Sequence, residues 1–166
     1  MHCPSSSRYP NRNKSASSPS HPKETALRIL SRRDHSEYEL IQKLLLKGFS
    51  REEIQPVMMY CQDYGYLDDL RYALSAIRQG MNKGHGERRI RQLLQQNRVA
   101  DDVVNIALEQ LAPDWFELAK QLAERKFKAQ PAIEAKEQAK RVRFLQSRGF
   151  SFEQIHYALS DQEETN

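Results

Sequence analysis

The chain is poor in cysteine and in long apolar runs, and each absence excludes a class of protein. Of its 166 residues only Cys3 and Cys61 are cysteines, which excludes a disulfide framework or a zinc site built on several cysteines. The longest unbroken apolar run is Val57–Cys61, whereas a membrane-spanning helix needs about 20 residues. No apolar segment of a secretory signal lies near the start of the sequence. We therefore expect a cytoplasmic protein that does not contact a membrane.

The chain also has little net charge outside its first 22 residues. The formal net charge is +4, and residues 1–22 carry +3 of it through Arg8, Arg12 and Lys14. This segment is rich in serine and proline and has almost no apolar residues, so it cannot bury enough surface to offset the entropy of ordering. We expect a disordered tail over residues 1–22. The basic pI is then weak evidence for nucleic-acid binding, and any such argument rests on local clusters.

The rest of the chain repeats itself. The segment LLLKGFSREEI at 44–54 returns as LQSRGFSFEQI at 145–155, and a shift of 50 brings the apolar residues of the middle of the chain onto the same pattern. Apolar residues recur at helical spacing and no segment alternates like a strand. We predict an all-α fold of three tandem three-helix repeats, at residues 23–67, 68–112 and 113–166, the last ending in a short tail. Such repeats stack into an elongated, curved array.

The repeated segment reads as the end of one helix followed by the start of the next. Gly48 and Gly149 suit the left-handed position that closes a helix, and Ser50 with Glu53 forms a capping box for the next helix. The middle repeat has Arg98 and Ala100 where the others have Gly and Ser, so there we expect Asn97 to close the helix. Pro56 falls inside an expected helix, which is predicted to begin or kink at that residue.

No catalytic or metal-binding pattern emerges. Paired acids occur at 52–53, 68–69 and 101–102, each at a predicted helix start, where acids favour the helix dipole and cap free amides. The five histidines lack the close spacing of a helical metal motif, and no Ser or Cys is placed beside a base. His35 and His85 lie at equivalent repeat positions, which indicates a shared structural role. We expect no enzyme activity, no cofactor and no metal.

Charge is distributed unevenly along the repeats. Residues 78–98 carry a local +5, residues 101–117 a local −5, and residues 120–148 a local +6. On the helix expected at 86–98, Arg88, Arg91 and Arg98 fall opposite the apolar face, and such a stripe of guanidinium groups suits phosphates or carboxylates. An ordinary solvated face is the alternative. For Phe144, among the basic residues at 133–148, core packing is favoured over base stacking.

Four segments resemble the RecX family of bacterial recombination regulators: RILSRRDHSEYEL at 28–40, YGYLDDLRYA at 64–73, KGHGERRIRQLL at 83–94 and RFLQSRGFSFEQI at 143–155. The resemblance covers residues 24–160 and implies tandem three-helix repeats. It also implies a non-enzymatic protein, expected as a monomer, that binds the RecA recombinase filament and mainly inhibits its assembly, ATP hydrolysis, strand exchange and co-protease activity. Single-stranded DNA is the secondary or indirect partner.

Joining the resemblance to the charge pattern yields candidate contact residues. The basic candidates, for recombinase or DNA, are Lys83, Arg88, Arg91, Arg98, Lys136, Lys140, Arg141, Arg143 and Arg148. The candidate acidic patch for the recombinase is Asp101, Asp102 and Glu109. A helix-turn-helix-type DNA-binding protein that competes for DNA would use the same basic helices, and it remains the alternative interpretation.

Overall fold

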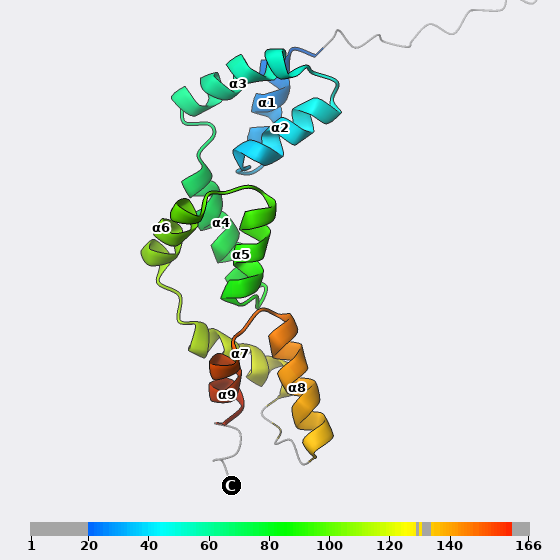
Figure 1. The fold of residues 1–166 in the computed structure, drawn as a ribbon, viewed down its shortest axis with the longest axis vertical. Helices are drawn as coiled ribbons and strands as arrows, with labels where there is room; N and C mark the ends of the chain where they lie inside the picture. Colours follow the sequence, from blue (N-terminus) through cyan, green and yellow to red (C-terminus); the bar gives the residue numbers. More distant parts are fainter. Residues whose placement is uncertain (1–19, 129, 131–133, 161–166) are drawn as a thin grey trace, which may run out of the picture.

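The structure is a computed structural model that describes residues 20–128, 130 and 134–160. Within these ranges the chain forms nine helices and no strand, stacked in three groups of three along one axis (Figure 1). The helices are α1 (Pro22–Leu30), α2 (Glu37–Leu46), α3 (Arg51–Asp63), α4 (Asp69–Asn82), α5 (Glu87–Gln96), α6 (Asp101–Leu111), α7 (Trp115–Phe127), α8 (Ala135–Ser147) and α9 (Phe152–Ser160). The predicted all-α fold of three tandem three-helix repeats is confirmed. The tail expected at residues 1–22 falls mostly on residues 1–19, outside the described ranges, and Pro22 begins α1.

The repeated glycine closes α2 as expected. Gly48 has φ +91°, and its N–H donates to the Leu45 carbonyl at 2.9 Å. The Phe49 N–H donates to the Leu44 carbonyl at 3.3 Å, which completes a Schellman motif. Ser50 and Glu53 then form both hydrogen bonds of a capping box for α3. Equivalent bonds recur around Gly149, between α8 and α9.

The middle repeat closes α5 by the same motif with a different residue. Asn97 caps the helix in a near-helical conformation, and Arg98 takes the left-handed position with φ +57°. The Val99 N–H donates to the Leu94 carbonyl at 3.0 Å, as Phe49 does in the first repeat. Asn97 therefore caps α5 as expected, and Arg98 supplies the left-handed position that glycine takes in the other repeats. A side chain other than glycine in this conformation costs about 1 kcal/mol, so something else must hold Arg98 there.

Pro56 neither starts nor ends a helix. Helix α3 runs from Arg51 to Asp63 with Pro56 inside it, so of the two expected outcomes, a helix start or a kink at the proline, the start is wrong. The Ser50 capping box fixes the start of α3 upstream of the proline, and the burial of Val57, Met58 and Cys61 on its inner face continues beyond it. Packing thus offsets the hydrogen bond that proline removes from a helix.

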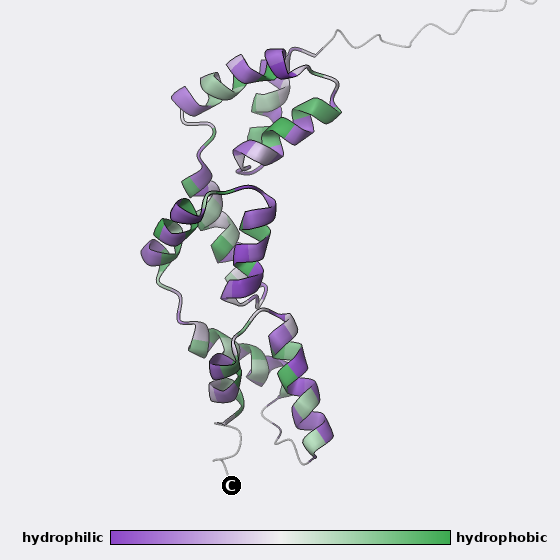
Figure 2. Cartoon of the chain, viewed as in Figure 1, coloured by the Kyte–Doolittle hydropathy of each residue, from purple (hydrophilic) through white to green (hydrophobic). Residues whose placement is uncertain are grey.

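Each repeat has its own hydrophobic core, and the described helices are amphipathic (Figure 2). The apolar residues matched by the sequence repeats lie in the three cores, with Leu44, Leu94 and Leu145 at one equivalent place and Ile54, Val104 and Ile155 at another. Trp115, the single tryptophan of the chain, packs against both the second and the third core. It therefore marks the boundary between those two repeats.

Polar bonds join the first repeat to the second. The Glu37 N–H, at the start of α2, donates to Asp69 Oδ1 at 2.9 Å, and Arg71 Nε donates to Asp34 Oδ1 at 2.8 Å. Arg98 adds a contact, its guanidinium carbon lying 5.2 Å from the centre of the Tyr38 ring. This contact crosses the repeat boundary and gives a physical reason for the left-handed arginine.

Candidate functional site

The second and third repeats meet where the end of α8 lies against the start of α5 (Figure 1). The Gly86 N–H donates to the Arg148 carbonyl oxygen at 2.7 Å, and the Arg88 N–H donates to the Gly149 carbonyl oxygen at 3.3 Å. The first N–H groups of a helix and its last carbonyls have no partners within the helix, so these two ends satisfy each other. Their dipoles also align head to tail. Backbone atoms therefore hold α5 and α8 together.

This junction requires glycine on both sides. A Cβ atom at Gly86 would lie 2.5 Å from the Gly149 carbonyl carbon, and one at Gly149 would lie 2.6 Å from the Arg89 backbone nitrogen. Gly149 also has φ +95°. The glycine predicted only to close a helix thus has a second role, because its missing side chain lets two repeats approach at backbone distance.

A groove of about 930 Å³ crosses the same junction, between α5 and the end of α8. Lys83, Arg88 and Arg89 line it with exposed side chains, and its other polar lining is mainly glutamine. No Asp or Glu lines the groove among the described residues. Both helices show broad hydrophilic bands in Figure 2. The groove is therefore suited to anionic groups, since several Arg and Lys donors converge without a competing carboxylate.

Arg148 contacts both a residue that lines the groove and an aromatic ring of the third repeat. Its Nη1 donates to the Lys83 carbonyl at 3.3 Å, and its guanidinium lies 5.1 Å from the centre of the Phe144 ring. Phe144 in turn packs edge-to-face on Phe127, with ring centres 5.7 Å apart, and belongs to the edge of the third core. The core-packing interpretation of Phe144 is confirmed, and Arg148 links the core to the groove.

The structure divides the arginine stripe expected on α5. Arg88 lines the groove, but Arg91 Nε binds Glu87 Oε1 at 2.7 Å and its Nη1 binds Asn105 Oδ1 at 2.9 Å. Arg98 lies beyond the end of α5 and reaches toward the first repeat instead. Arg89, which is not among the predicted contact residues, lines the groove beside Arg88.

Helix α8 presents some of its predicted basic residues and buries one. Lys136, Lys140 and Arg143 are exposed. Arg141 is only 4% exposed, so its expected place on an exposed basic face is corrected. Its Nη1 donates to the Gln130 carbonyl at 2.6 Å and its guanidinium lies 4.7 Å from the centre of the Phe127 ring. A guanidinium can be buried in this way because its donors and its flat face are both used.

The predicted acidic patch is exposed on another side of the second repeat. Asp101, Asp102 and Glu109 lie on α6, away from α8 (Figure 1). Asp101 and Asp102 are in the first turn, as predicted from the helix dipole, although Ala100 occupies the cap position and makes no side-chain bond. The molecule thus carries exposed acidic residues on α6 and exposed basic residues on α5 and α8.

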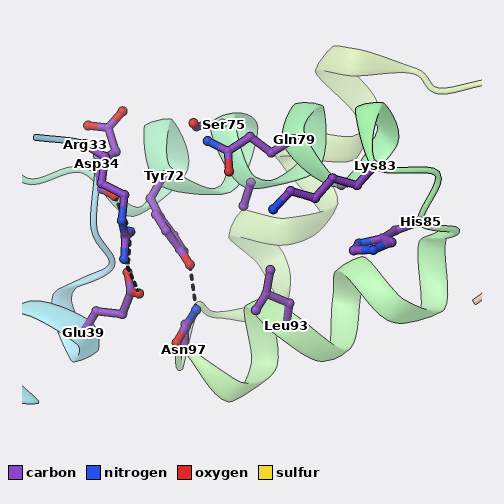
Figure 3. Close-up of a pocket in the computed structure, with 12 residues that line it drawn as sticks. Arg33, Asp34, Glu39, Tyr72, Ser75, Gln79, Lys83, His85, Leu93 and Asn97 are labelled. Atoms are coloured by element: carbon purple, nitrogen blue, oxygen red, sulfur yellow. Dashed lines mark hydrogen bonds and ion pairs between the residues drawn. The ribbon is translucent and has the colours of Figure 1, made fainter. Parts of the chain in front are cut away.

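A smaller hollow of about 220 Å³ lies between the first and second repeats. Figure 3 shows the Lys83 side chain extended along it, below Gln79 and toward Tyr72, whose hydroxyl accepts from Asn97 Nδ2 at 2.6 Å. Lys83 and His85 line both this hollow and the α5–α8 groove. The two hollows therefore adjoin on one face of the molecule.

Both repeat-equivalent histidines precede the second helix of their repeat. Burial lowers the pKa of His35, the hydrogen bond to the Arg33 carbonyl partly opposes this, and the positive charges of Arg33 and Lys43 lower the pKa again. Burial also lowers the pKa of His85, with Arg89, Arg148 and Lys83 acting in the same direction. Both shifts favour the neutral form of the ring. The shared structural role of the pair stays a prediction, and the cations around His85 disfavour a further positive charge in the groove.

Three family models match the chain in order along its length. They describe the first, second and third three-helix domains of RecX and match residues 23–61, 68–108 and 113–159. None of the helices in the described part of the chain is long and apolar enough to cross a membrane.

Curated relatives carry the same family name. The Regulatory protein RecX of Vibrio vulnificus is 59% identical over 140 residues, which cover 84% of this chain and 92% of the relative. The Regulatory protein RecX of Chromohalobacter salexigens is 38% identical over 139 residues, covering 84% and 91%.

Two solved structures share the fold. One, described as regulatory protein RecX, superposes with a TM-score of 0.67 at 28% identity, covering 84% of this chain and 72% of the other. RecX from Lactobacillus salivarius superposes with a TM-score of 0.71 at 23% identity, covering 86% and 94%. The second comparison shows a common fold over nearly the whole of both chains.

Proposed function

Since the chain belongs to the RecX family of regulatory proteins, we propose that it binds the RecA recombinase filament on single-stranded DNA. Binding mainly inhibits the assembly of the filament, its ATP hydrolysis, its strand exchange and its co-protease activity. The relatives are named regulators and not enzymes, which supports action by binding without catalysis. The protein partner is the recombinase, and single-stranded DNA is contacted secondarily or through it.

The α5–α8 groove is the observation that carries this proposal. Its exposed cations, Lys83, Arg88 and Arg89, are held on a junction fixed by backbone hydrogen bonds. A rigid, acid-free groove of this kind fits acidic edges of recombinase subunits or the phosphates of the strand within the filament. The acidic residues of α6 face elsewhere and fit basic recombinase surface.

The elongated array explains how binding could disassemble a filament. Three repeats along one axis can reach more than one recombinase subunit, and several weak contacts then add into useful affinity. A ligand shifts an equilibrium only through its different affinity for the two states. The protein therefore inhibits if it holds neighbouring subunits in an arrangement unlike that of the active filament.

The test reverses charge in the groove. We expect Arg88→Glu/Arg89→Glu to raise the concentration needed for half-maximal filament disassembly by about tenfold or more, because each exposed pair contributes about 0.2–1 kcal/mol and reversal adds repulsion. The control is Arg51→Glu/Arg78→Glu, which makes the same change in net charge at exposed sites outside the groove. Equal losses of disassembly activity in the two variants would show that the groove does not contact the filament.

The alternative, a DNA-binding protein that competes for the strand, predicts a different pattern. In that case the protein binds free single-stranded DNA at the concentrations that remove the filament, with a steep loss of affinity as salt rises. Measuring both titrations on the same DNA separates the two functions.

A further inference from the structure

A second basic site lies in the first repeat, in a cleft between α1 and α2 that is separate from the α5–α8 groove. The cleft has a volume of about 510 Å³, which is within the range of small-ligand sites. The apolar residues Ile29 and Leu46 form part of its lining, and no Asp or Glu does among the described residues. Its cations are Arg28, Arg32, Arg33, Lys43 and Lys47.

Three of these cations have no polar partner in the part of the chain that the structure describes. Arg28, Arg32 and Lys47 make no side-chain hydrogen bond or ion pair there, whereas Arg33 is paired with Glu39 at 3.1 Å. Basic residues near helix C-termini often bond the last carbonyls of the helix, and these three do not. Their like charges share one cleft, and a bound anion would relieve their mutual repulsion.

Lys43 is held in the cleft by a buried histidine. His35 Nδ1 lies 2.9 Å from the Arg33 carbonyl oxygen, which can only accept, so Nδ1 carries the proton. Nε2 is then an acceptor, and it lies 2.7 Å from the Lys43 ammonium nitrogen. One proton of the ammonium is fixed in this bond, and the others are free to meet a ligand. The cleft therefore has a preorganised donor besides its flexible arginines.

The residues that line the cleft indicate which class of ligand it binds. Leu46 is 87% exposed beside the cations, so the site presents an apolar surface next to converging positive charge, and a nucleotide has an apolar base face next to its phosphate. Arg33 also lines the hollow between the first two repeats, which adjoins the α5–α8 groove. The cleft and the groove are thus two positive sites, separated by a hollow that Asp34 and Glu39 line together with Arg33 and Lys83.

We propose that the cleft between α1 and α2 binds the phosphate groups of nucleotides, with the base against Leu46. The phosphates come either from a single-stranded nucleic acid or from a free nucleoside triphosphate. Arg28, Arg32 and Lys47 bind them directly, together with the ammonium positioned by His35. Binding at this cleft does not require the recombinase.

The test uses the full chain alone, without recombinase. A fluorescein-labelled oligothymidylate of about 20 nucleotides is titrated by fluorescence anisotropy at about 50 and 200 mM salt, and a fluorescent ATP analogue is titrated in parallel. The cleft variant is Arg28→Glu/Lys47→Glu, and the control is Arg51→Glu/Arg78→Glu, with the same change in net charge. Far-UV circular dichroism checks folding, and if charge reversal unfolds the chain the milder Arg28→Gln/Lys47→Gln decides.

We expect the cleft variant to weaken oligothymidylate binding by about tenfold and the control by less than about threefold. Cleft-dependent binding of the ATP analogue would assign the phosphate to a free nucleotide as well, and binding of the oligonucleotide alone would assign it to a strand. Three results would overturn the proposal: equal losses in the two variants, no binding of either probe to the wild-type chain, or equally strong competition by a polyglutamate peptide.

Discussion

Alanine at the two repeat-equivalent glycines tests the junction between the second and third repeats. Gly48 and Gly149 have nearly the same backbone conformation, with φ +91° and +95°, so alanine costs about 1–2 kcal/mol of conformational free energy at either. A Cβ atom at Gly48 meets nothing within 4 Å, but at Gly149 it would lie 2.6 Å from the Arg89 backbone nitrogen. Overpacking of this kind costs about 1–3 kcal/mol, and the hydrogen bond from Arg88 N–H would add about 1 kcal/mol if lost.

We therefore expect Gly149→Ala to lower the free energy of unfolding by about 2–4 kcal/mol more than Gly48→Ala. Urea unfolding followed by circular dichroism measures the whole chain. Trp115, which packs on both the second and the third core, reports on the junction through its fluorescence. The fluorescence transition should move to lower urea in Gly149→Ala and stay nearly unchanged in Gly48→Ala.

Equal destabilisation by the two alanines would refute the reasoning. It would mean that the close approach of Gly149 to α5 contributes nothing and that each glycine only closes its helix. An unchanged tryptophan transition in Gly149→Ala would likewise show that the third repeat does not depend on α5 for its position.

Three further predictions concern single residues. Thr25→Val should raise the free energy of unfolding by about 1 kcal/mol in urea titrations, because Thr25 Oγ1 is buried without a hydrogen-bond partner among the described residues; a loss of stability would contradict this. The pKa of His35 in the folded state lies below the ordinary value of 6.5, because burial disfavours the charged ring. The unfolded chain therefore binds more protons than the folded chain as the pH falls through 6.5. The free energy of unfolding should be greatest above that pH and should decline below it. A urea midpoint that is flat between about pH 7.5 and about pH 5.5 would disprove it. Arg98→Gly relieves about 1 kcal/mol of strain and loses about 0.5–1 kcal/mol from the Tyr38 contact, so stability should hardly change, whereas Arg98→Ala loses the contact without the relief and should be measurably less stable.

Local signals in the sequence predicted most of the fold. Gly48 and Ser50 determine a helix end and a helix start within three residues, and the same signals recur near Gly149. The periodic apolar residues then determine which face of each helix is buried. Predictions were less accurate where packing overrides local preference, as at Pro56 and at Arg98, whose strained conformation depends on a contact with Tyr38 in another repeat.

The candidate site was predicted less completely, because it depends on how the repeats meet. Helical periodicity places Arg88 on a polar face, but it cannot show that the end of α8 brings Arg89 into the same groove. The burial of Arg141 depends on Phe127, 14 positions earlier, and the cleft at Arg28 and Lys47 depends on the packing of α1 against α2. Gly149 offered one signal, since glycine in a repeated motif can mark a close approach as well as a turn.

The most direct test of the central claim follows fluorescent single-stranded DNA while the protein is titrated onto preassembled RecA filaments, with free DNA as the control. We expect loss of the filament signal at concentrations too low to bind free DNA, which would establish regulation through contacts with the recombinase. Binding to free DNA at the same concentrations, with filaments lost only by competition for the strand, would contradict it.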